Sequence, residues 1–155
     1  MNDNTESTIE TMNDLVKINY DRVKGYEKAS EELKSTDVDL HTMFLKMASD
    51  SKEHIARLKE RVLALGGEPD DDSSISGDIH RTWMDIKNVF TGHDRTSILE
   101  SCEFGEDAIL KAYKEALEDD DLDAASRTLI SDQRNELKGS HDTVKRYRDM
   151  HKQAS

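Results

Sequence analysis

A few residues of this sequence have the types and the spacing of metal ligands. Tyr113 follows Glu106 by seven residues and precedes His141 by 28. Tyr26 precedes His54 by the same 28 residues. Two imidazoles and one carboxylate suit Fe(II) or Zn(II), because these ions accept nitrogen and oxygen ligands and can keep a position open for water. The residues therefore allow a single metal ion to be held by His54, Glu106 and His141.

The same residues also allow a site without a metal ion. Glu106 falls on the inward stripe of its predicted helix, where a carboxylate needs a cation or a hydrogen-bond donor. Lys138 lies three residues before His141, and its ammonium group could take the role of a cation beside Glu106. We prefer this arrangement, or a looser hydrated form of it, because a lysine is hard to reconcile with an adjacent metal ion. The predicted polar core network, which would fix the helix register, comprises Asn19, Tyr26, Ser51, Tyr113 and Lys138, together with Glu106 and the two histidines.

Four long helices must position these side chains. Apolar residues recur at steps of three and four in four stretches, which predicts four amphipathic helices. The stretches are 9–33, 38–65, 94–117 and 122–150. The links within the first pair of helices and within the second pair are short, so each pair must be antiparallel.

The connection between the two pairs is different. Residues 66–93 are long enough to run from one end of the bundle to the other, and they contain an amphipathic segment that predicts a short fifth helix, with Trp83 packed on the bundle. Two hairpins joined by one long crossover define a known topology. We therefore predict an all-α, ferritin-like antiparallel four-helix bundle formed by residues 1–155 as a single domain.

The composition limits the class of protein. The chain has 155 residues, of which 34% are apolar and 36% charged, with a single proline, as is typical of a helical domain. Its formal charge of −12 argues against nucleic acid or an anionic membrane as a partner, since clustered basic residues hold both. No segment approaches the ~20 apolar residues of a membrane span, so we expect a soluble, cytoplasmic protein. Cys102, the single cysteine, lies on an apolar helix face and is expected to be buried and unreactive.

Several segments resemble those of a bacterial ferritin-like four-helix-bundle family whose domain has no assigned function. The resemblance runs from about residue 12 to 149, and it implies the fold without implying a reaction. The segments are INYDRVKGYEKA (18–29), HIARLKERVLALGGEP (54–69), SGDIHRTWMDIK (76–87), CEFGEDAILKAYKEAL (102–117) and SHDTVKRY (140–147).

More distantly, the chain is similar to the ferritin and rubrerythrin group, in which each half of the bundle supplies carboxylate and histidine ligands to two metal ions. Glu106, His54 and His141 match that pattern. Asn19, Ser51 and Lys138 stand where three further carboxylates would be expected. One carboxylate and two neutral imidazoles cannot offset the four positive charges of two divalent ions, so a di-iron centre is not expected. Glu103 and Glu27 flank the inward stripes and could add a carboxylate, although a solvated surface position is the simpler interpretation.

These observations favour a ferritin-like bundle without catalytic activity, with a structural, interaction or stress-related role and a degenerate metal site that binds no cofactor. The alternative is a protein that binds one iron or zinc ion, or a redox protein, using His54, Glu106 and His141. A homo-oligomer or a complex with a protein partner is a third interpretation.

Overall fold

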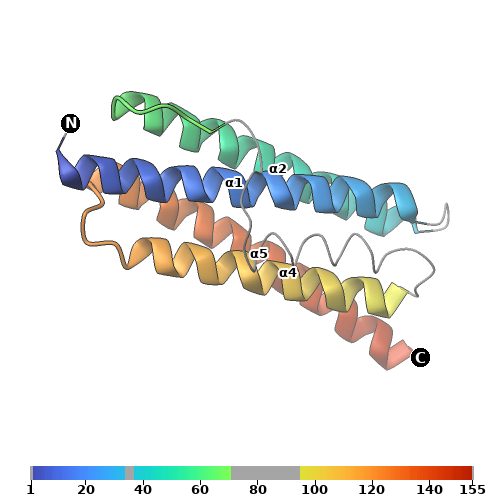
Figure 1. Ribbon diagram of the computed structural model, residues 1–155. Helices are drawn as coiled ribbons and strands as arrows, with labels where there is room; N and C mark the ends of the chain where they lie inside the picture. The colour runs from blue at the N-terminus through green and yellow to red at the C-terminus, as the bar shows by residue number, and fades with distance from the viewer. Residues whose placement is uncertain (1, 34–36, 71–94, 155) are drawn as a thin grey trace.

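The computed structural model describes residues 2–33, 37–70 and 95–154, and these residues form four helices packed as a bundle (Figure 1). The helices are α1 (Asp3–Glu32), α2 (Val38–Ala64), α4 (Arg95–Leu117) and α5 (Ala124–Ala154). α1 packs along α2, α4 packs along α5, and the two hairpins meet through contacts of α1 with α4 and of α2 with α5. The helices of each hairpin run in opposite directions, and α2 ends at the opposite end of the bundle from the start of α4. The predicted all-α bundle is therefore confirmed.

The helix boundaries lie close to those predicted, with two extensions. α1 begins at Asp3 rather than near residue 9, because Asn2 caps it: its Oδ1 accepts a hydrogen bond of 2.7 Å from the Thr5 N–H. Asp3 and Glu6 in the first turn also stabilise the helix, because their negative charges lie at the positive end of the helix dipole. α5 continues past residue 150 to Ala154. The predicted fifth helix and Trp83 lie outside the described residues.

A Schellman turn ends α2, as the Gly-Gly pair at 66–67 predicts. Gly66 has a φ of 87°, and its N–H donates to the Leu63 oxygen at 3.0 Å. The Gly67 N–H donates to the Val62 oxygen at 2.9 Å. A Cβ at Gly67 would lie 2.7 Å from Cδ1 of Ile9, so this turn packs directly on the first part of α1.

The bundle core consists of two apolar clusters with polar side chains between them. One cluster includes Met12, Leu58 and Ile109, and the other includes Phe44 and Leu99. Buried or partly buried polar residues lie on each helix near the junction of the two clusters. They include Asn19 and Arg22 on α1, Ser51 and His54 on α2, Glu106 on α4 and His141 on α5. No helix among the described residues is long and apolar enough to cross a membrane.

Candidate functional site

The carboxylate of Glu106 is fully buried at the centre of the bundle, and its partner is Arg22 of α1. Arg22 Nη2 donates to Glu106 Oε1 at 2.8 Å and Nε donates to the same oxygen at 3.1 Å, with both side chains 0% exposed. The hydroxyl of Tyr26 also donates to this oxygen. A guanidinium from α1, rather than a lysine from α5, thus neutralises the carboxylate.

Arg22 connects three helices through its remaining contacts. Its Nη1 donates to Ser51 Oγ at 2.8 Å and to the main-chain oxygen of Met47 at 3.2 Å, both on α2. The guanidinium carbon lies 5.3 Å from the centre of the Tyr26 ring, a distance at which the cation is attracted to the ring. Burial alone would lower the pKa of Arg22, but the charge and hydrogen bond of Glu106, together with Tyr26 and Asp50, outweigh it and raise that pKa, so Arg22 stays charged. Burial, and then Glu106, raise the pKa of Tyr26 well above its usual value, which keeps the phenol a donor.

A chain of hydrogen bonds continues from Ser51 to the fourth helix. Ser51 Oγ donates to Asn19 Oδ1 at 2.9 Å, and Asn19 Nδ2 donates to the Tyr113 hydroxyl at 2.8 Å. That hydroxyl donates to Gln133 Oε1 at 2.7 Å, and Gln133 Nε2 donates to the main-chain oxygen of His54 at 3.2 Å. The buried network therefore includes side chains from all four helices, and sliding any of them by one turn would break it.

The structure places Lys138 away from this network. Its side chain is 54% exposed, and Nζ lies 2.8 Å from Oδ1 of Asp142, one turn along α5. Leu137 takes the inward position, and each residue along a helix turns by about 100°, so Lys138 points elsewhere. The expectation that Lys138 neutralises Glu106 is wrong, because Arg22 does so.

Arg22 itself was missed because an arginine within an apolar stripe is normally interpreted as a surface residue. One signal could have identified it. Arg22 lies three residues after Asn19 and four before Tyr26, so it shares their helix face. Once Glu106 is expected to be buried, a cation on that face is the natural partner.

The three residues expected to hold a metal ion lie in three different settings. Glu106 is bound to Arg22. His54 is buried, and its Nε2 lies 3.4 Å from the Glu136 carboxylate, which is 70% exposed. His141 is 15% exposed and lies next to Asp107 of α4. The structure therefore does not bring His54, Glu106 and His141 together as a ligand set.

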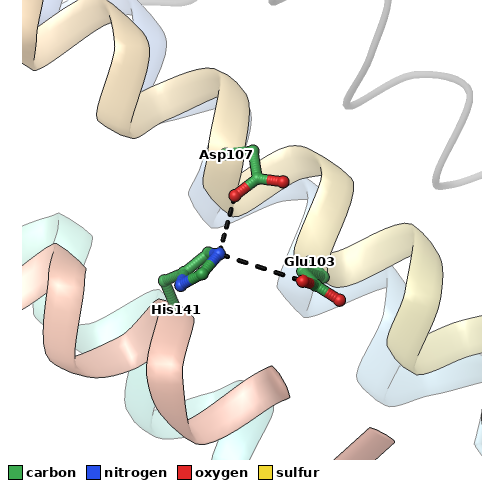
Figure 2. Close-up of side chains that lie close together, drawn as sticks. All are labelled: Glu103, Asp107 and His141. Atoms are coloured by element: carbon green, nitrogen blue, oxygen red, sulfur yellow. Dashed lines mark ion pairs between the residues drawn. The ribbon is translucent and has the colours of Figure 1, made fainter.

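A different group of ligand-type side chains does converge. Among the described residues, one ligand atom each from Glu103, Asp107 and His141 lie within 4.8 Å of one another (Figure 2). His141 Nε2 is 2.6 Å from Asp107 Oδ1 and 4.0 Å from Glu103 Oε1. The α4–α5 cluster, as we call these three residues, lies at the seam between the two helices of the second hairpin.

Two further groups of the centre are held neutral. Burial, and then Arg22, lower the pKa of His54 to about 4, and the carboxylates of Asp50 and Glu53 offset only part of this. Burial, and then Glu106, raise the pKa of the Cys102 thiol well above its usual value. Cys102 is 0% exposed, as predicted, and its raised pKa disfavours the reactive thiolate form.

Comparison with solved structures identifies the fold. Desulfovibrio desulfuricans bacterioferritin, which has a diiron site, superimposes with a TM-score of 0.82 at 21% identity, over 97% of this chain and 83% of that one. A DPS protein of Vibrio cholerae O1, from the superfamily of ferritin-like diiron-carboxylate proteins, gives 0.74 at 17%, over 93% and 90%. A ferritin-like diiron-carboxylate protein of Bacillus anthracis gives 0.63 at 18%, over 99% of both chains. The fold is therefore ferritin-like.

The family follows from the sequence match. Residues 7–119 match the family described as Domain of unknown function (DUF2383), and the chain belongs to it. None of the curated proteins matches the sequence significantly.

The residues at the bundle centre do not fit the di-iron centre that such a fold implies. The buried hydrogen-bonded network contains one carboxylate, Glu106, and that carboxylate is already neutralised by Arg22. Two divalent ions would bring four positive charges next to a permanent guanidinium in a poorly solvated core. The chain shares the fold of the diiron proteins, but the charges at its centre do not offset those of two divalent ions.

The buried ion pair predicts a strong and non-additive effect of substitution. Arg22→Met leaves Glu106 buried without a cation and is expected to lower the free energy of unfolding by about 3–5 kcal/mol. Arg22→Met combined with Glu106→Gln removes both charges and keeps an acceptor for Tyr26, so much of this loss should be recovered. Urea denaturation measures both, with Lys138→Met as a surface control that should change stability by less than about 0.5 kcal/mol. Additive losses in the double variant would show that the two charges are not coupled.

His54 predicts a pH dependence of stability. Its pKa is lowered to about 4 in the folded protein, so between pH 6.5 and 4 the unfolded chain binds the proton more readily, and acid favours unfolding. The full contribution is about 3 kcal/mol, present above pH 6.5 and lost as the pH falls to 4. Urea denaturation between these pH values should give a flatter profile for His54→Gln than for the wild type. Identical profiles would show that His54 is protonated as easily in the bundle as in the unfolded chain.

Proposed function

We propose that this protein is a ferritin-like bundle whose centre serves stability rather than metal chemistry, and that it acts as a structural or interaction protein. The observation that supports this is the Arg22 side chain, fully buried at the centre and hydrogen-bonded to Glu106, Ser51 and the main chain of Met47. A metal ion at Glu106 would lie next to this permanent positive charge, which three partners hold in place. The protein is therefore proposed to lack the iron oxidation of a di-iron site.

Contacts with other molecules must then be made through the surface. Several large apolar side chains are exposed on the described helices, the most exposed being Phe104 of α4 at 66%. Leu45 and Leu63 of α2 are 53% and 62% exposed. Single apolar side chains are common on protein surfaces, but a phenylalanine this exposed suits contact with a second copy or with another protein. The charge of −12 weighs against a nucleic-acid partner.

Binding of one divalent metal ion is the second candidate function, and a different observation favours it. The ligand atoms of Glu103, Asp107 and His141 lie close together in the α4–α5 cluster, which supports such a site. His54 and Glu106 lie next to other partners and do not support one.

Iron chemistry distinguishes the proposed function from that of a di-iron protein. We expect the purified protein, incubated aerobically with Fe(II), to consume no more oxygen than buffer does and to retain no pair of iron atoms per chain after desalting. The assay would use D. desulfuricans bacterioferritin as the positive control. Two iron atoms per chain that are lost in Glu106→Gln would overturn the proposal.

Self-association tests the interaction role. If Phe104 contacts a second copy, the sedimentation coefficient of the wild type should rise with protein concentration, and Phe104→Ser should weaken the dimer by roughly tenfold or more, as for an apolar interface residue. Leu63→Ser, on α2, provides the matched control. A wild type that sediments as a monomer at every concentration would contradict self-association through Phe104.

A further inference from the structure

Two carboxylates of α4 and one imidazole of α5 are aimed at a common point. Glu103 and Asp107 are four residues apart, so they lie on the same helix face one turn from each other. Figure 2 shows His141 facing them from α5, with its Nε2 directed at both carboxylates. Glu106 lies between these two residues in the sequence but turns inward to Arg22, so the α4–α5 cluster is separate from the bundle centre.

His141 is oriented by a group outside the cluster. Its Nδ1 lies 3.1 Å from Oδ1 of Asp142, an oxygen that Lys138 Nζ also contacts at 2.8 Å. A proton on Nδ1 satisfies Asp142 and leaves Nε2 as the nitrogen that faces α4. Metal-binding histidines are held in this way, with a carboxylate on the second ring nitrogen that fixes the ring and raises its basicity as a ligand.

The charges around the cluster favour a cation. Glu103, Asp107, Asp142 and Asp149 supply four carboxylates, against the two permanent cations Lys138 and Arg148, so an excess of two negative charges remains when His141 is neutral. Glu103 and His141 are 14% and 15% exposed, and Asp107 is 59% exposed. The site is thus partly shielded from water and still open to an ion from solution.

We propose that Glu103, Asp107 and His141 bind a single divalent ion of the zinc class. Zinc accepts imidazole nitrogen and carboxylate oxygen at about 2.0–2.2 Å, which places tetrahedral ligand atoms about 3.3 Å apart. The two distances from Nε2, 2.6 Å and 4.0 Å, lie on either side of that value, and the exposed Asp107 can rotate to equalise them. The three side chains would supply three ligands, with water at the fourth position.

Arg148 is an internal competitor for this site. Its Nη1 pairs with Glu103 Oε2, and its Nη2 lies 2.9 Å from Asp149 Oδ1. A metal ion must share or replace this guanidinium as the partner of Glu103. Removal of Arg148 therefore strengthens metal binding, whereas it can only weaken a cluster that serves as an ion-pair network.

Calorimetric titration of chelator-treated protein with ZnCl2 tests the proposal, with Co(II) absorption as a report on ligand geometry. The wild type should bind one ion per chain. His141→Ala and Asp107→Asn should each weaken binding by roughly tenfold or more. Arg148→Gln should tighten it. Glu115→Gln, which changes an exposed carboxylate of the same helix, should leave it unchanged.

Zinc that binds equally well to the wild type and to His141→Ala would overturn the proposal, as would a wild type that binds no zinc. Urea denaturation of the metal-free variants verifies that the bundle is intact. We expect it to be, because His141 and Asp107 lie at the surface seam. The outcome is separate from that of the iron assay, because the α4–α5 cluster includes neither Glu106 nor His54.

Discussion

A guanidinium and a carboxylate occupy the centre of this bundle out of contact with water, and the polar part of the core is arranged to keep them there. Removal of two charges from water costs several kcal/mol per ion, and mutual attraction offsets this only when the geometry is good and the other polar groups are satisfied. Ser51 and the Met47 oxygen accept from Arg22, and Tyr26 donates to Oε1 of Glu106, whereas Oε2 has no hydrogen-bond partner among the described residues. Each of these hydrogen bonds joins two helices, so the ion pair sets the relative positions of α1, α2 and α4.

The same pair explains how a ferritin-like fold can exist without the charge balance of a diiron protein. A fold determines which helix faces meet at the centre, whereas the side chains there determine whether cations are attracted. In this chain the positive charge at the centre belongs to the protein itself. The second concentration of carboxylates, the α4–α5 cluster, lies at the surface seam of one hairpin, where an ion can arrive without disturbing the core.

Much of the fold could be predicted from sequence, and the partner of Glu106 could not. The apolar stripes with steps of three and four identify the helices, and the Gly-Gly pair identifies the end of α2. A core prediction based on apolar stripes treats charged residues as surface residues. It therefore omits Arg22 and leaves Glu106 without its partner. Lys138 lies three residues before His141, and this spacing predicts that both face inward. His141 lies at the seam rather than in the core, so the prediction for Lys138 is wrong as well.

The chain separation of the central pair has a kinetic consequence. Arg22 and Glu106 are 84 residues apart, and they belong to different hairpins, each of which is built from helices joined by a short link. Local contacts close first because they cost less loop entropy, so the pair forms only after the hairpins have docked. Interactions absent from the transition state slow unfolding without speeding folding. The buried ion pair thus acts mainly on the lifetime of the assembled bundle, because it must break before the hairpins can part.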